Sequence, residues 1–458
     1  MFAQYIENEK KSILERLFEC LRIASISADS QYRDTCLKQA NWLIELFERW
    51  GYQAELWQAD VADGLPTVFA QNEQIDGRPT ILFYGHYDVQ PVDPITLWDS
   101  DPFEPIIKDN YIFARGANDD KGQLFTFLEA LHAFDIVGNS LNLNIKIFLE
   151  GEEESGSPSL KGILDSHKNQ LACDVVLVSD VDMWSPTQPA FTTMLKGKAA
   201  FEVTLTGPIR DLHSGLYGGP VSNPAVILSR IIGKMFDDNN HVLIPGFYDD
   251  IKEIDANIKQ NWAPLNEHLL KNMADVGMTV PGGEKGYTAL EQNWCRPTLE
   301  INGLTSGYQG EGGKTIIPSK ASAKISCRLV EGQDPNKILK SFHEFFHKHC
   351  PTDIKVNFEG EAGARAFVVD HNDPFVQKAK NALDDIFKDE CLLIGCGASI
   401  PAAIDLKEIT NAPIILGGWG QPSDAIHAPN ENYSLGRFFK GIEGWGAILQ
   451  AFEKKEIL

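Results

Sequence analysis

The chain has 458 residues, enough for roughly two or three domains with sizeable hydrophobic cores. Its residues are 43% hydrophobic and 23% charged, as in globular proteins, and no apolar run approaches the ~20 residues needed to span a bilayer. Because the formal net charge of −23 repels nucleic acids and anionic membrane surfaces, we expect neither as a partner.

The cysteines and the first residues indicate the cytoplasm. The eight cysteines are scattered without a Cys-x-x-Cys pair, which argues against a thiolate zinc site and against a disulfide framework. The N-terminal segment carries acidic side chains and lacks the hydrophobic stretch of a signal peptide. We therefore expect a protein of the reducing cytoplasm.

The first part of the chain predicts two helices followed by alternating strands and helices. Apolar residues recur at helical spacing over 4–26 and again over 33–50. Strand-like runs then alternate with helical stretches as far as Asp182, the pattern of a mostly parallel sheet covered by helices on both faces. We expect this α/β fold over residues 1–196.

From about residue 197 the pattern is that of antiparallel strands with one solvated face. Apolar and polar residues alternate over 199–205, 296–301, 322–330 and 354–358, with helical stretches at 222–236 and 335–349. The chain then returns to a buried strand and closes with a helix from about Tyr433. We predict an inserted α+β domain over 197–387, with the first domain completed by 388–458.

Four strand-like runs end or break close to acidic or imidazole side chains. These lie at His86 and Asp88, at Glu150 to Glu154, at Asp180 and, after the fourth run, at His427, while Asp119 and Asp120 lie in a loop between the first two runs. In open α/β sheets, ligands bind beyond the carboxyl ends of the strands, so side chains distant in sequence can converge there. The pattern predicts a metal centre at this edge.

The neighbours of these residues support a metal centre, although each has a simpler interpretation. Asp88 can lie on the same side of its strand as His86 and accept the second imidazole N–H. The carboxylates at 152–154 repel one another, and cations or protonation can compensate this repulsion. The simpler interpretation is that they form a solvated acidic loop. Asp180 and Asp182 compete for one role, and either can instead cap a turn.

Motifs of one known family recur along nearly the whole chain. They are Gly85-His86-Tyr87-Asp88, Arg115-Gly116-Ala117-Asn118-Asp119, Glu150 to Glu154, Ser179-Asp180, His213-Ser214-Gly215, Gly313-Lys314-Thr315, Arg328, Gly397-Ala398-Ser399 and His427. Together they resemble the two-zinc exopeptidases and deacylases, which include carnosinase-type dipeptidases, aminoacylase, glutamate carboxypeptidase and succinyl-diaminopimelate desuccinylase. The cytosolic dipeptidase branch is the most similar.

The resemblance implies two metal ions and their ligands. It implies that Asp119 bridges both ions, that His86 and Asp180 complete one coordination sphere, and that Glu154 and His427 complete the other. Oxygen and imidazole ligands without thiolate suit zinc, with manganese or cobalt as alternatives. The fold that the resemblance implies is a zinc-exopeptidase-like α/β domain with an inserted lid and dimerisation domain.

The resemblance also assigns catalytic roles close to the metal ions. A carboxylate beside the metals that does not ligate them can act as general base, and this role falls to Glu153. Asp88 belongs to the catalytic set as the partner of His86. Members of the family have a cis peptide after the bridging aspartate, which corresponds here to the Asp119–Asp120 bond.

Three further residues match positions that contact the substrate in the family. His213 matches a histidine that reaches the active site from the partner subunit's lid and stabilises the oxyanion, which implies a homodimer. Arg328 matches the guanidinium that binds the free carboxylate of the substrate, for which bidentate geometry is suited. Ser399 belongs to the substrate-binding stretch.

The implied reaction is hydrolysis of an amide bond next to a free carboxylate, in dipeptides or short peptides. The stretch Gly395-Cys396-Gly397-Ala398-Ser399 lacks the arginine of the dipeptidase pattern. An alternative function is therefore that of an N-acyl amino acid deacylase, such as a succinyl-diaminopimelate desuccinylase. A third interpretation, a binding protein that has lost catalysis, predicts gaps among the ligands or the base, and none is found.

Two other motifs are not expected to carry the chemistry. His343-Glu344-Phe345-Phe346-His347 matches a zinc-protease signature, but at helical spacing both histidines lie opposite the apolar side and face solvent. The glycine-rich stretch 307–315 does not have the spacing of a phosphate-binding loop, and strand-like residues follow it where a helix is required.

Overall fold

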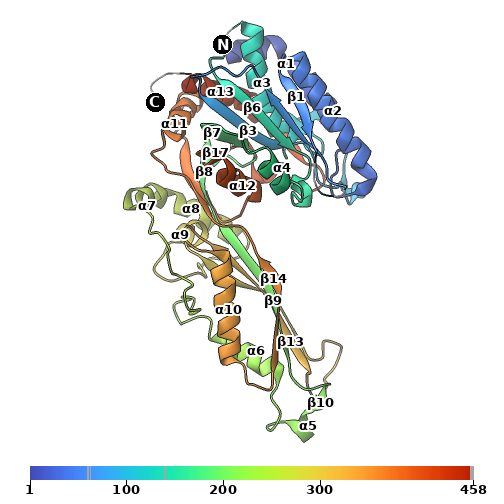
Figure 1. Cartoon of the computed structure of the whole chain (residues 1–458), viewed down its shortest axis with the longest axis vertical. Coiled ribbons are helices and arrows are strands. Elements are labelled where there is room, and N and C mark those ends of the chain that lie inside the picture. The colour runs from blue at the N-terminus through green and yellow to red at the C-terminus, as the bar shows by residue number, and fades with distance from the viewer. Residues whose placement is uncertain (59–60, 62, 139–140, 454–458) are drawn as a thin grey trace. The chain divides into compact units, whose positions relative to one another are not determined.

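The structure is a computed structural model that describes residues 1–58, 61, 63–138 and 141–453 (Figure 1). The chain forms two compact units. Unit 1 consists of Met1–Thr193, Val369–Ile394 and Ala402–Leu458, and unit 2 of Met194–Val368 and Gly395–Pro401. Unit 2 thus lies between segments of unit 1 along the chain.

The boundaries of the insertion differ from the prediction at the second crossing. The predicted insertion extends to residue 387, whereas α11 (Pro374–Phe387) belongs to unit 1. The reason is its packing against α13 (Leu435–Phe452), where the rings of Phe375 and Phe452 lie 5.1 Å apart. The amphipathic pattern of α11 does not indicate which domain supplies its partner.

Unit 1 is built on a sheet with parallel strands at its centre. In order across the sheet, its strands are β1 (Gln53–Trp57), β2 (Thr67–Gln71), β6 (Asn144–Glu150), β3 (Thr80–His86), β7 (Val175–Ser179), β17 (Ile414–Gly417) and β8 (Ala190–Leu195). The four strands β6, β3, β7 and β17 run parallel, and the flanking strands pair antiparallel. Strands β15 (Phe367–Val368) and β16 (Leu392–Cys396) also pair with β8.

Helices bury the central strands, which explains their nearly continuous apolar sequences. Every residue of β6 and β7 is buried, as expected for parallel strands with both faces covered. The helices of unit 1 are α1 (Phe2–Leu21), α2 (Arg33–Arg49), α3 (Lys121–Val137), α4 (Leu160–Ser166), α11, α12 (Pro401–Thr410) and α13. Figure 1 shows that the first (blue) and last (red) helices both belong to unit 1, where α1 packs against α13. The predicted α/β class is confirmed.

Helix α3 is buried on almost every side and contains a buried ion pair. Glu129 is fully buried and accepts hydrogen bonds from Arg16 Nε and Nη2, both at 2.7 Å, and from Tyr5 Oη at 2.7 Å. Such a carboxylate can be buried because its charge and its lone pairs are compensated. This ion pair joins α1 to α3.

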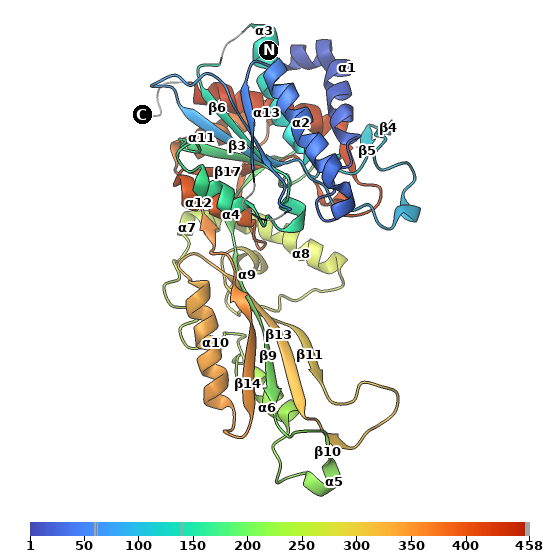
Figure 2. The ribbon, with the colours of Figure 1, turned by 45° about the vertical axis from the view of Figure 1, so that its right-hand side comes forward.

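Unit 2 contains a four-stranded antiparallel sheet in the order β11 (Thr298–Ser306), β13 (Lys320–Leu329), β9 (Gly197–Thr206) and β14 (Lys355–Ala362). Burial alternates along β9, so one face is covered and the other is solvated, as predicted. The helices α6 (Pro224–Gly233) and α10 (Pro335–His349) lie along the sheet and contribute to its hydrophobic core (Figure 2).

Shorter elements complete both units. Unit 2 also contains β10 (Leu212–His213), β12 (Ile316–Ile317), α5 (Ser214–Tyr217), α7 (Ala256–Trp262), α8 (Asn266–Asp275) and α9 (Ala289–Trp294). In unit 1, β4 (Ile106–Lys108), β5 (Tyr111–Phe113) and β18 (Asn432–Ser434) form a small separate sheet. Among the described residues, no helix is both long enough and apolar enough to cross a bilayer.

Candidate metal centre and active site

The predicted ligands lie at one edge of the unit 1 sheet. Strand β3 ends at His86, β7 ends one residue before Asp180, and the turn that contains Glu153 and Glu154 follows β6. Because these strands are parallel, their carboxyl ends meet at the same edge. Asp119 lies two residues before the start of α3, and His427 lies in the loop between β17 and β18.

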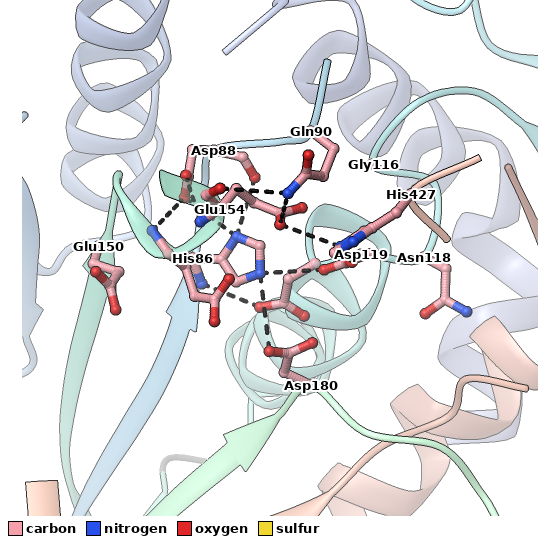
Figure 3. A network of polar contacts seen from close by, with 12 residues as sticks. His86, Asp88, Gln90, Gly116, Asn118, Asp119, Glu150, Glu154, Asp180 and His427 are labelled. Atoms are coloured by element: carbon pink, nitrogen blue, oxygen red, sulfur yellow. Dashed lines mark hydrogen bonds and ion pairs between the residues drawn. The ribbon is translucent and has the colours of Figure 1, made fainter. Parts of the chain in front are cut away.

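Five side chains form two potential metal-binding groups that share Asp119. One group is His86, Asp119 and Asp180, and the other is Asp119, Glu154 and His427. Within each group the ligand atoms all lie within 4.8 Å of one another. The structure thus brings together all five residues that the resemblance named as ligands (Figure 3).

Asp119 contacts a histidine with each of its two oxygens. Its Oδ1 lies 3.3 Å from His86 Nε2, and its Oδ2 lies 2.8 Å from His427 Nε2. The Nε2 atom of His86 is 3.9 Å from Asp180 Oδ2, and that of His427 is 3.2 Å from Glu154 Oε2. Asp119 therefore has the position of a carboxylate that two cations can share.

The residues fit a pair of divalent cations. His86 Nε2 and Glu154 Oε1 are buried and make no hydrogen bond with the described residues, so these two donor atoms are free to act as ligands. The donor set consists of carboxylates and imidazoles, which suit zinc or manganese. Within the described part of the chain, no lysine or arginine is paired with any of the five side chains.

The pKa values indicate that the site carries more negative charge than the protein itself compensates. Burial, with the charges of Asp120 and Asp119, raises the pKa of Asp180 well above its ordinary value. Hydrogen bonds to Asp119 and Glu154 raise the pKa of His427 to about 10. A bound cation reverses these shifts because it stabilises deprotonated carboxylates and neutral imidazoles.

Asp88 holds two parts of the site together. Its Oδ1 lies 3.3 Å from His86 Nδ1, and its carbonyl oxygen lies 3.1 Å from the same nitrogen. Its two carboxylate oxygens also accept hydrogen bonds from the backbone N–H groups of Glu153 and Glu154, at 3.2 and 3.0 Å. Asp88 thus orients the His86 ring and fixes the turn that carries Glu153.

Glu153 has the surroundings of a proton acceptor. Burial raises the pKa of its carboxyl group, the charge of His86 lowers it, and the charge of Glu154 raises it again, with a net upward shift. A carboxylate with a raised pKa is a stronger base than one in water. Asp182, the alternative to Asp180 as a ligand, is in neither metal-binding group.

Sequence reasoning missed two residues that contact the ligands. Gln90 donates from Nε2 to Glu154 Oε2 at 2.7 Å, so it orients this carboxylate towards His427 (Figure 3). Its position two residues after Asp88 was the available signal, because alternate residues of an extended segment share one side. The second residue is Glu431, whose carboxylate accepts the backbone N–H of Asp119 at 3.1 Å.

The other three predicted site residues lie in unit 2. Arg328 donates from Nη1 to Ser399 Oγ at 3.0 Å, and the Ser399 hydroxyl donates to the carbonyl oxygen of Lys196. Among the described residues, no acidic side chain pairs with Arg328. His213 is exposed at the start of α5, where its Nδ1 accepts the N–H of Gly215 at 3.0 Å.

The second histidine motif lies on the solvated side of α10. His343, Glu344 and His347 are exposed, whereas Ile338, Phe342, Phe345 and Phe346 of the same helix are buried. The two imidazole rings are 4.4 Å apart, and neither residue belongs to a group of three potential ligands in the described chain.

The predicted cis peptide between Asp119 and Asp120 is present, as is a second one between Asp93 and Pro94.

Known proteins resemble this chain over nearly its full length. Residues 82–451 match the model of peptidase family M20/M25/M40. The chain is 27% identical to the Cys-Gly metallodipeptidase dug1 of Schizosaccharomyces pombe, over 96% of this chain and 95% of that protein. It is 26% identical to the human Beta-Ala-His dipeptidase, over 97% of this chain and 91% of that protein.

Solved structures agree with the sequence comparisons. The M20 family metallo-carboxypeptidase Sso-CP2 from Sulfolobus solfataricus is 30% identical, with a TM-score of 0.79 over 96% of this chain and 99% of that one. The dipeptidase Dug1p from Saccharomyces cerevisiae is 25% identical, with a TM-score of 0.76 over 99% and 98% of the two chains. The chain belongs to peptidase family M20/M25/M40, and the predicted enzyme class, a metallopeptidase of the dipeptidase branch, is confirmed.

Proposed function

We propose that the protein uses two divalent cations to hydrolyse dipeptides or short peptides at the amide bond next to a free carboxylate. The observation that carries this proposal is the position of Asp119 between two groups of ligands. One of its oxygens faces His86 and the other faces His427. A site for a single cation requires only one group of ligands, not a second group that shares a carboxylate with the first. The donor set favours zinc, with manganese or cobalt as alternatives.

The two ions supply Lewis-acid chemistry, which lowers the pKa of the attacking water and polarises the scissile carbonyl. The chain supplies the proton acceptor. Glu153 takes the proton from the attacking water and donates it to the leaving amine, a role for which its raised pKa is suited. Asp88 keeps Glu153 in place through the backbone of the turn.

Arg328 is the proposed binding group for the free carboxylate of the substrate. It is a cation without an acidic partner in the described chain, and its contact with Ser399 Oγ leaves other N–H groups of its guanidinium available. Guanidinium and carboxylate groups form bidentate pairs. The relatives named for Cys-Gly and Beta-Ala-His cleavage favour a dipeptide substrate.

The inserted domain is proposed to form a homodimer and to bring His213 to the partner's site. Around His213, the side chains of Ile209 and Leu216 are 97% and 75% exposed in the single chain. Covering such apolar side chains with another protein surface removes them from water, which is favourable. We also propose a cytoplasmic location, which the eight free cysteines support because disulfides are rare in reducing compartments.

Dipeptides should be hydrolysed faster than N-acyl amino acids by the purified protein. The test is a panel of Cys-Gly, β-Ala-His, N-acetyl and N-succinyl amino acids, each assayed with added Zn²⁺, Mn²⁺ or Co²⁺. A preference for the N-acyl compounds would identify the alternative, a deacylase of the desuccinylase type.

Glu153→Gln should lower kcat by about 10²- to 10⁴-fold without lowering the metal content, and unchanged kcat would exclude Glu153 as the base.

Arg328→Met should raise KM for dipeptides about 10- to 100-fold, because hydrogen bonds to a charged group contribute roughly 1.5 to 3 kcal/mol. The same substitution should have little effect on the corresponding dipeptide amides, which lack the carboxylate. Arg365→Met is the control, since Arg365 is an exposed arginine of the same unit that pairs with Asp334. Equal losses on acids and amides would contradict the assignment.

His213→Ala and Glu153→Gln should each abolish most activity, yet a mixture of the two variants should recover part of it. If His213 acts across the dimer, a mixed pair contains one intact site, so random pairing restores roughly a quarter of the wild-type activity. The variants are unfolded and refolded together, and the activity of the mixture is compared with the sum of the separate samples. A mixture no more active than that sum would show that His213 does not act across subunits.

A further inference from the structure

Glu431 holds the backbone of the loop that presents Asp119. The side chain is fully buried, and each of its carboxylate oxygens accepts two hydrogen bonds. Oε1 accepts the N–H groups of Asn118 and Asp119 at 2.9 and 3.1 Å. Oε2 accepts the N–H of Gly116 at 2.9 Å and Nη1 of Arg115 at 2.7 Å. One carboxylate therefore binds three backbone N–H groups of a four-residue segment.

The backbone of Glu431 joins the same two segments. Its carbonyl oxygen accepts the N–H of Ala114 at 3.2 Å, and the next residue, Asn432, pairs with Phe113 where β18 meets β5. His427 lies four residues before Glu431. The segment that carries His427 is thus attached, through Glu431, to the loop that carries Asp119.

A second buried carboxylate fixes the other side of this loop. Asp424 accepts a hydrogen bond from the side-chain Nδ2 of Asn118 and from Arg437 Nη1, the latter at 2.7 Å. Asn118 is therefore held by its backbone through Glu431 and by its side chain through Asp424. Asp119 follows directly, so its backbone has little freedom to move.

We propose that Glu431 is a positioning residue for the metal pair, which it serves by fixing the Asp119 carboxylate relative to His427. This inference rests on the proposed two-metal function. A ligand shared by two cations must be held within about 0.5 Å of its productive place, so its supporting contacts decide the affinity. Residues that support metal ligands in this way typically contribute about 10- to 100-fold to metal affinity.

Glu129 provides a matched control for a purely structural role. It is also a fully buried carboxylate of unit 1 that pairs with one arginine, Arg16, at 2.7 Å. Its other partner is Tyr5 Oη, and none of its hydrogen bonds reaches a proposed metal ligand. Glu129→Gln should therefore reduce stability as Glu431→Gln does, without acting on the cations.

The experiment measures Zn²⁺ binding to metal-free wild type, Glu431→Gln and Glu129→Gln by competition with a chromophoric chelator. An amide nitrogen cannot accept hydrogen bonds, so Glu431→Gln leaves two of the four donors without an acceptor. We expect its Zn²⁺ affinity to fall about 10- to 100-fold, with a smaller rise of Tm on adding Zn²⁺, while Glu129→Gln binds as wild type. Wild-type affinity in Glu431→Gln, or equal weakening in both variants, would overturn the proposal.

Glu431→Asp covers the case in which Glu431→Gln does not fold. It keeps the charge but withdraws the carboxylate by one methylene, so the three backbone N–H groups cannot all be reached. Weaker Zn²⁺ binding by this variant supports the proposal, and wild-type binding overturns it. Absence of Zn²⁺ binding in the wild type itself would instead overturn the two-metal function on which the inference rests.

Discussion

The accumulation of carboxylates around Asp119 is the constraint on which the rest of the site depends. Burial and mutual repulsion raise the pKa values of Asp180 and Glu153, and the two histidines do not balance the negative charge. Repulsion of this kind is unfavourable unless cations occupy the spaces between the oxygens. The same arrangement that destabilises the metal-free protein therefore creates its affinity for two cations.

The fold makes this accumulation possible by placing rigid elements around it. Parallel strands bring His86, Asp180 and the turn after β6 to one edge, while buried acceptors fix the connecting loops. Asp88 binds the turn that carries Glu153, and Glu431 binds the loop that carries Asp119. Asp119 and Glu154 are thus held through their backbone N–H groups, an arrangement that does not use the oxygens of their own side chains.

Much of the site was predictable from the sequence because its ligands follow strands that have recognisable patterns. His86 and Asp180 stand directly at strand ends, and the family motifs extend to Asp119 and His427. Glu431 was not predictable, because its partners are backbone N–H groups more than 300 residues away, and these have no side-chain signature. The second domain boundary differs from the prediction for a related reason. Helix α11 belongs to unit 1 because it packs on α13, and its own amphipathic pattern does not indicate which unit it packs against.

The most direct test of the central claim is anomalous X-ray diffraction at the zinc edge from crystals grown with Zn²⁺. Two peaks about 3.5 to 4 Å apart, on either side of the Asp119 carboxylate, are the expected result for a shared-carboxylate pair. One ion should contact His86 and Asp180, and the other Glu154 and His427. A single peak, or zinc bound only at His343 and His347 of α10, would contradict the two-metal centre.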